Sequence, residues 1–179
     1  MNFNKVYGSP EFPTIPGDEL AILAESARRS SIQYHTLQGY ISENRVIRYL
    51  CDLAGVTRVT KIPDYAEGHG GDVSFKYRNN VWSVEIKTVT IKDNGVGSVS
   101  IKPTRKSDVV QAYRRGHFDL LAVAITNRGE NGLLFVHTDA LPNHKVNPLF
   151  LQGSLTIKEV NDFFPFSYSL GKALAKPSG

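Results

Sequence analysis

The chain has 179 residues, of which 41% are hydrophobic and 21% are charged, proportions that are ordinary for one soluble globular domain. Its single cysteine, Cys51, excludes an internal disulfide and any zinc site built from several cysteines. No stretch of about twenty apolar residues and no signal peptide at Met1 are visible, so we expect a cytoplasmic protein that does not span a membrane. The net charge of +4 favours a polyanionic partner.

The N-terminal region has two parts. Residues 1–16 contain three prolines and no apolar periodicity, which predicts an irregular arm. A first helix is expected to begin at Gly17-Asp18-Glu19 and to end near Ser30. It could serve dimerisation, DNA contact or core packing.

A second helix is predicted from Tyr40 to Gly55. Its apolar residues recur at spacings of three and four, and a glycine suits the helix end. Glu43 lies at the start of the inward-facing stripe. It is either an acid that complements the helix dipole in the first turn or a member of an active site.

Two strands with period-two alternation follow, from Asp72 to Tyr77 and from Val81 to Lys87, and they predict a β-hairpin with one apolar face. If Asn79-Asn80 forms the turn, Asp72 and Glu85 are diagonal neighbours on the polar face. A pairing register shifted by two residues, with the turn centred on Arg78-Asn79, would set Asp72 directly opposite Glu85. Both registers bring the two carboxylates together, although charged residues on a solvated hairpin face are an ordinary alternative.

The order Asp72, twelve intervening residues, Glu85, Ile86, Lys87 resembles the motif of the PD-(D/E)XK nuclease superfamily. Gly71 stands where the family motif has proline, and a literal Pro63-Asp64 upstream makes Asp64 an alternative motif acid. Residues 39–87 are also similar to archaeal Holliday junction resolvases and some restriction enzymes. The resemblance implies a restriction-endonuclease-like core and places Glu43 in the active site.

These residue types suit a hard divalent cation. Two neighbouring carboxylates repel each other unless an ion or a proton lies between them. We therefore expect Mg²⁺, with Mn²⁺ as a substitute, bound by Asp72, Glu85 and the backbone carbonyl of Ile86. Lys87 would orient or deprotonate the attacking water, or stabilise the transition state by its charge.

Basic residues gather downstream of the motif, where they could bind the phosphodiester backbone or form a solvated face: Lys102, Arg105, Lys106, Arg114 and Arg115. Residues 107–116 predict a helix closed by Gly116 that carries Gln111 and Tyr113. The resemblance implies a glutamine and a tyrosine near the scissile phosphate, although Gln111 is otherwise a surface residue. His69 would contact phosphate or lie in an exposed loop.

The last predicted strands are two apolar runs, residues 118–125 and Leu133 to Val136, each expected to be buried on both faces. The order of elements predicts an α/β fold, with a central mixed β-sheet flanked by α-helices. We expect one nuclease domain over residues 1–179, with a catalytic core over residues 36–137 and a C-terminal extension over residues 138–179.

The function expected from these residues and the resemblance is that of a Mg²⁺-dependent DNA endonuclease that leaves a 5′-phosphate. About ninety residues follow Lys87, which favours sequence-specific cleavage of the restriction or homing type. The alternatives are a structure-specific enzyme, such as a junction resolvase or repair nuclease acting on branched DNA, and an inactive DNA-binding module. Cutting both strands of a duplex suits a homodimer.

Overall fold

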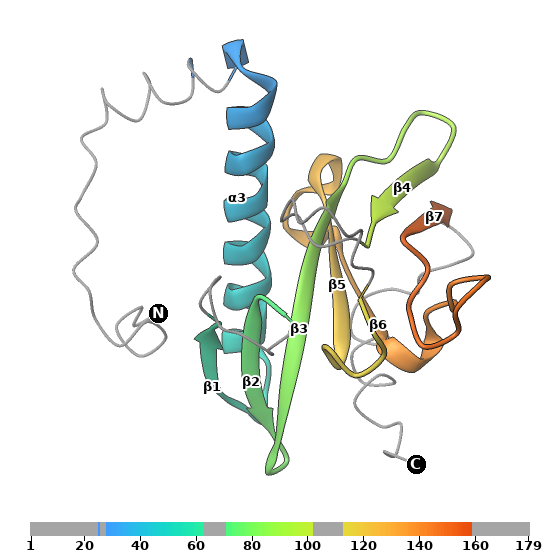
Figure 1. The fold of residues 1–179 in the computed structure, drawn as a ribbon. Helices are drawn as coiled ribbons and strands as arrows, with labels where there is room; N and C mark the ends of the chain where they lie inside the picture. Colours follow the sequence, from blue (N-terminus) through green and yellow to red (C-terminus); the bar gives the residue numbers. More distant parts are fainter. Residues whose placement is uncertain (1–24, 26–27, 63–70, 102–112, 159–179) are drawn as a thin grey trace.

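The computed structural model describes Glu25 and residues 28–62, 71–101 and 113–158 (Figure 1). The main elements in chain order are α3 (Ser31–Asp52), β1 (Val56–Lys61), β2 (Val73–Tyr77), β3 (Asn80–Val89), β4 (Val96–Ser100), β5 (Leu120–Ile125), β6 (Leu133–His137) and β7 (Ser154–Lys158). Two 3-10 helices, η1 (Thr126–Asn131) and η2 (Thr138–Ala140), flank β6. Among these described residues, no helix is both long and apolar enough to cross a bilayer.

Helix α3 is longer than the sequence pattern predicts, because it begins at Ser31 and not at Tyr40. The side chain of Ser30 accepts a hydrogen bond from the backbone N–H of Gln33, which caps the helix start. The inward-facing stripe is confirmed, since Val46, Ile47 and Leu50 are buried. Most of the first predicted helix lies outside the described residues.

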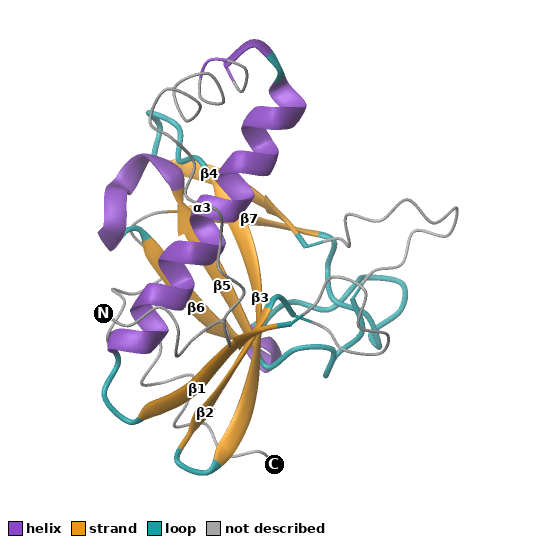
Figure 2. Ribbon diagram, turned by 90° about the vertical axis from the view of Figure 1, so that its left-hand side faces the viewer, coloured by secondary structure: helices purple, strands orange, loops and turns teal. Residues whose placement is uncertain are grey.

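Five strands form a mixed sheet in the order β1-β2-β3-β5-β6. Neighbouring strands are antiparallel except for β3 and β5, which run parallel. Helix α3 crosses one face of this sheet (Figure 2). The expected mixed α/β architecture is therefore present, with the β2–β3 hairpin inside the sheet.

The hairpin turn is formed by Arg78 and Asn79, whose φ angles are 47° and 69°. The turn predicted at Asn79-Asn80 is wrong, because Asn80 pairs with Tyr77 and belongs to β3. A two-residue turn of this kind needs positive φ at both central positions, and asparagine tolerates it well. The alternative register is the one found, with Val73 opposite Val84, and the apolar face is unchanged by the even shift.

Two cores lie on opposite faces of the sheet. The first packs under α3 and contains Phe75 and Trp82. Strand β5 contributes alternate residues to both cores, Ala122 to the first and Val123 to the second, and all six of its residues are buried. The prediction of burial on both faces is confirmed for β5 and is wrong for β6, where Leu134 and Val136 are only half-buried.

The second face of the sheet is covered, among the described residues, by the antiparallel pair β4 and β7 (Figure 1). We expected helices on both sides. Residues 96–100 form β4, and the C-terminal region supplies its partner. The predicted N-terminal arm and the chain after Lys158 lie outside the described residues.

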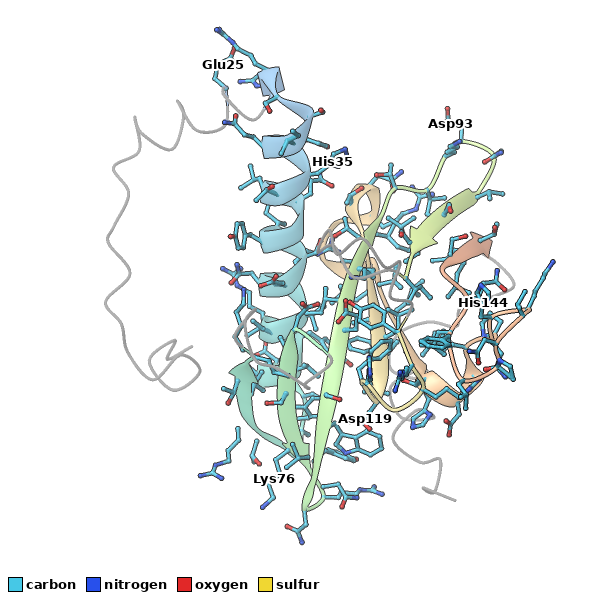
Figure 3. All side chains as sticks on the ribbon, in the orientation of Figure 1. Glu25, His35, Lys76, Asp93, Asp119 and His144 are labelled. Carbon is cyan, nitrogen blue, oxygen red and sulfur yellow. The ribbon has the colours of Figure 1, made fainter. Side chains whose placement is uncertain are left out.

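Asp119 anchors β5 to β3. Its carboxylate accepts hydrogen bonds from the N–H of Ser83 at 2.7 Å and from the Ser83 hydroxyl at 2.9 Å. Figure 3 shows Asp119 near the start of β5. This acid, directly before the strand that neighbours β3, therefore has a structural role.

Candidate active site

Asp72 lies directly before β2 and is fixed by three hydrogen bonds to backbone groups, two of them on β3 and one at the residue that follows β1. Its N–H donates to the carbonyl of Val84 at 2.7 Å, and its own carbonyl accepts from the N–H of Ile62 at 2.8 Å. The carboxylate accepts from the N–H of Ile86 at 2.7 Å. The motif acid is thus held in place on both its main chain and its side chain.

Gly71 makes this close approach of the two strands possible. Its φ is +105°, and a Cβ placed on it would lie 3.0 Å from the carbonyl oxygen of Val84. Proline, which holds φ near −65°, could not adopt this conformation. The glycine that stands in place of the proline of the family motif is therefore required by the local backbone.

The Asp72 carboxyl carries an unusual charge environment. Its pKa is raised from 3.8 to about 7, chiefly by burial and next by the negative charge of Glu85. The Ile86 N–H and the Lys87 ammonium act against this shift but do not cancel it. Two acids from neighbouring strands therefore share a poorly solvated region with more negative charge than the protein neutralises.

Glu85 is 3% exposed, which is rare for a carboxylate. Its Oε1 accepts a hydrogen bond from the hydroxyl of Tyr113 at 2.6 Å and lies 2.5 Å from Nζ of Lys87. Burial, followed by the charge of Glu85, raises the pKa of Tyr113 above its usual value, so the phenol remains a donor at neutral pH. Both named partners contact the same oxygen of Glu85.

Lys87 is placed between Glu85 and an aromatic ring. Its side chain is 16% exposed, and Nζ lies 5.6 Å from the centroid of the Tyr113 ring. An ammonium group over an aromatic face is attracted by the ring quadrupole. The predicted catalytic lysine is therefore held beside the carboxylates.

Glu43 lies near this group but pairs with another residue. It is in the middle of α3, so the first-turn dipole interpretation no longer applies. Its Oε2 lies 2.5 Å from Nζ of Lys61, at the end of β1, and its charge contributes to the raised pKa of Asp72. Lys61 was not predicted, because nothing in the local sequence indicates that the end of β1 meets α3.

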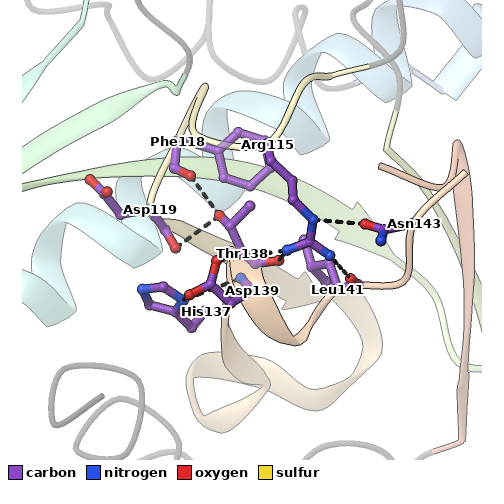
Figure 4. Close-up of polar contacts among 8 residues, drawn as sticks. All are labelled: Arg115, Phe118, Asp119, His137, Thr138, Asp139, Leu141 and Asn143. Atoms are coloured by element: carbon purple, nitrogen blue, oxygen red, sulfur yellow. Dashed lines mark hydrogen bonds and ion pairs between the residues drawn. The ribbon is translucent and has the colours of Figure 1, made fainter. Parts of the chain in front are cut away.

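The predicted basic rim is only partly described. Arg115 donates hydrogen bonds to the side chain of Asn143 and to the carbonyls of Thr138 and Leu141 (Figure 4). Its guanidinium therefore holds the chain around η2 together. Arg114 is exposed, with its guanidinium 5.5 Å from the ring centroid of Phe150.

The helix predicted over residues 107–116 is wrong in its described part, because residues 113–116 form a bridge and a turn. Arg114 pairs with Phe150 in an isolated antiparallel bridge, which draws this segment towards the C-terminal region. Several predicted site residues lie outside the described residues: Asp64, His69, Lys102, Arg105, Lys106 and Gln111.

The donor set of this site fits a magnesium or manganese ion. Asp72 and Glu85 offer hard carboxylate oxygens, and Oε2 of Glu85 has no hydrogen-bond partner within the described part of the chain. No three acidic, histidine or cysteine side chains form a metal-binding group in the described ranges. Mg²⁺ needs only one or two protein carboxylates, because water and substrate phosphate supply the remaining ligands.

Comparisons with known proteins leave the family open. No protein-family model matches the chain, and no curated protein sequence matches it. Among solved structures, a bacterial homing endonuclease, I-Ssp6803I, is similar with a TM-score of 0.48 and 17% sequence identity, over 76% of this chain and 83% of the other.

Proposed function

We propose that this protein is a Mg²⁺-dependent DNA endonuclease of the PD-(D/E)XK type that hydrolyses phosphodiester bonds. The observation that carries the proposal is the position of Asp72 beside Glu85, with the raised pKa of Asp72 and with Lys87 at the same carboxylates. A divalent ion would relieve the repulsion between the two acids that the protein itself leaves uncompensated.

A bound Mg²⁺ would supply Lewis-acid stabilisation of the phosphate and a more acidic water. The residues that would hold it are Asp72 and Glu85, with the carbonyl of Ile86 as a further candidate. The Ile86 N–H fixes one oxygen of Asp72, and this contact orients the carboxylate without neutralising it. The fixed backbone reduces the reorganisation needed when the ion binds.

Lys87 would provide the positive charge beside the scissile phosphate. Its Nζ is held by Glu85 Oε1 and by the Tyr113 ring, so the side chain has little freedom to leave the site. A positive charge fixed in a poorly solvated site stabilises negative charge that develops on the phosphate oxygens. The same ammonium can also orient the attacking water.

The proposed substrate is duplex DNA cut at specific sequences, as in restriction or homing enzymes. Support comes from the chain beyond Lys87, which builds a second layer from β4 and β7 in addition to the strands that complete the sheet. The exposed Arg114 offers a phosphate contact on this side of the molecule. A homodimer would place two sites on the two strands of the duplex.

The test is cleavage of a mixed DNA library, and of plasmid and branched DNA, with Mg²⁺ or with EDTA, followed by sequencing of the fragment ends. We expect Mg²⁺-dependent cuts at a preferred sequence by the wild type. Asp72→Ala and Glu85→Ala should lose cleavage and keep DNA binding, measured by fluorescence anisotropy in EDTA. Preferred cutting of branched DNA would indicate a structure-specific enzyme.

Asp93→Asn is the matched control, because Asp93 is an exposed acid in the loop between β3 and β4 (Figure 3). It should cut DNA at the wild-type rate. Wild-type cleavage by either Asp72→Ala or Glu85→Ala would show that the catalytic assignment is wrong.

A further inference from the structure

Tyr113 contacts both charged residues at the end of the motif. Its hydroxyl donates to Oε1 of Glu85 at 2.6 Å, and its ring lies 5.6 Å from Nζ of Lys87. The hydroxyl contact joins residues 28 positions apart in the sequence. One side chain from outside the hairpin therefore touches the proposed metal ligand and the proposed catalytic lysine.

The backbone of Tyr113 is fixed by the C-terminal part of the described chain. Its carbonyl accepts a hydrogen bond from the N–H of Leu151 at 2.8 Å, and the next residue, Arg114, forms the bridge with Phe150. Leu151 is fully buried in the second core. The position of the tyrosine is thus set by packing on the β4–β7 side of the sheet.

The ring of Tyr113 is also held by its aromatic neighbours. It packs edge-on against Phe118, with the ring centroids 5.3 Å apart, and against His117 at 6.3 Å. Edge-to-face contacts at such distances are favourable and restrict the orientation of the ring. The hydroxyl therefore reaches Glu85 from a direction that the core determines.

We propose that Tyr113 is a positioning residue of this site, acting through Glu85 and Lys87. The inference rests on the proposed function. The phenol would hold Oε1 of Glu85, so that Oε2 is the oxygen offered to a divalent ion, while the ring confines the ammonium of Lys87. Partners that orient a ligating carboxylate contribute to metal affinity although they do not touch the ion.

A purely structural role makes a different prediction. If the hydroxyl only satisfies a buried carboxylate, its removal lowers the thermal stability and leaves metal affinity and turnover unchanged. If it positions Glu85, metal affinity falls and kcat falls, while KM for DNA is unchanged. Metal affinity and the split between kcat and KM therefore separate the two roles.

The test compares Tyr113→Phe with Tyr77→Phe. Tyr77 is a half-buried tyrosine at the hairpin turn, and its hydroxyl makes no hydrogen bond within the described residues. The quantities to be measured are Mn²⁺ binding by calorimetry without DNA, the melting temperature in EDTA, and kcat and KM for DNA with Mg²⁺. In Tyr113→Phe, both the Mn²⁺ affinity and kcat should fall roughly 10 to 100-fold, which is the usual effect of removing a residue that orients a metal ligand. In Tyr77→Phe, both should match the wild type.

A further variant, Tyr113→Leu, removes the ring as well and should reduce kcat below that of Tyr113→Phe, because Lys87 also loses its aromatic contact. If Tyr113→Leu does not fold, Tyr113→Phe, which lacks only one oxygen, decides the question. Mn²⁺ affinity and kcat of Tyr113→Phe within twofold of the wild type would overturn the inference.

The two proposals fail in different ways. A wild-type protein that neither binds Mn²⁺ nor cuts DNA would remove the proposed function itself. A wild type that does both, with a Tyr113→Phe variant equal to it, would remove only the positioning role.

Discussion

The carboxylate of Glu85, on β3, raises the pKa of the Asp72 carboxyl that lies beside it at the head of β2. Burial is the largest cause of the shift, and all causes together take the pKa of Asp72 to about 7. At neutral pH the metal-free protein therefore has Asp72 close to half protonated. Under the proposed function, proton uptake and metal binding would compete for this one group.

The first prediction concerns stability without metal. The folded protein holds a proton on Asp72 between about pH 4 and pH 7, where the unfolded chain has released it. The contribution of Asp72 to the free energy of unfolding is therefore present at low pH. It is lost as pH rises through that window, at up to about 1.4 kcal/mol per pH unit. Asp72→Asn lacks this loss and can still accept from the Ile86 N–H.

Urea unfolding in EDTA from pH 4 to pH 8 measures this difference. The stability of Asp72→Asn relative to the wild type should rise with pH up to about pH 7 and then level off. A difference between the two proteins that does not change with pH would contradict the raised pKa.

The second prediction concerns the pair formed by Glu43 and Lys61. The wild type should bind Mn²⁺ more weakly as pH falls below about 7, because a proton then occupies Asp72. Lys61→Met leaves the charge of Glu43 without its cation, so the pKa of Asp72 should rise. The midpoint of the dependence of Mn²⁺ affinity on pH should then move to higher pH. Glu43→Gln removes a charge that raises the same pKa, so the midpoint should move to lower pH.

Calorimetric Mn²⁺ titrations in buffers from about pH 5.5 to about pH 8.5 test the effect of Glu43 and Lys61. This range brackets the Asp72 pKa of about 7. The double variant should lie between the two single variants. Midpoints that stay together for all four proteins would show that Glu43 does not influence the site.

The third prediction concerns Lys87. Lys87→Gln should lower kcat roughly 10² to 10⁴-fold, the usual range when a positioned acid–base or charged group is removed. Its effect on KM for DNA should be small, since the ammonium is bound to Glu85 and the Tyr113 ring and is 16% exposed. Single-turnover cleavage at saturating protein gives the rate directly. A Lys87→Gln variant that loses DNA affinity but keeps its cleavage rate would make this lysine a binding residue.

The fourth prediction separates two neighbouring arginines. Arg115 donates to two carbonyls and to Asn143, and it pairs with Asp139 at 3.7 Å, so Arg115→Ala should lower the melting temperature (Figure 4). Each lost hydrogen bond of a charged donor is worth about 1.5 to 3 kcal/mol. Arg114→Ala should keep the melting temperature and weaken DNA binding with a reduced salt dependence. The reverse pattern, a stable Arg115→Ala variant with weak DNA binding, would show that Arg115 contacts DNA.

The hairpin acids could be predicted from the sequence because period-two alternation fixes which side chains share a face. The turn was misplaced by one residue, since two asparagines follow Arg78 and either pair suits a positive φ. An even shift in register keeps the faces, so Asp72 and Glu85 meet in both versions. The burial of strand β5 on both faces could also be predicted, because its apolar run is uninterrupted.

The contacts from distant segments could not be predicted. Tyr113 lies beside Glu85 because the next residue, Arg114, is bridged to Phe150, and Lys61 reaches Glu43 because α3 packs over β1. Neither pairing leaves a periodic pattern in the local sequence. The helix start was missed for a local reason, because the cap at Ser30 and the turns that follow it contain few apolar residues that face the core.

Mn²⁺ binding to the isolated protein, measured by calorimetry at pH 8, tests the central claim most directly. We expect a bound ion in the wild type and in Asp93→Asn, and no measurable binding in Asp72→Asn or Glu85→Gln. An ion that binds equally well to Asp72→Asn or Glu85→Gln, or a folded wild type that binds none, would contradict it.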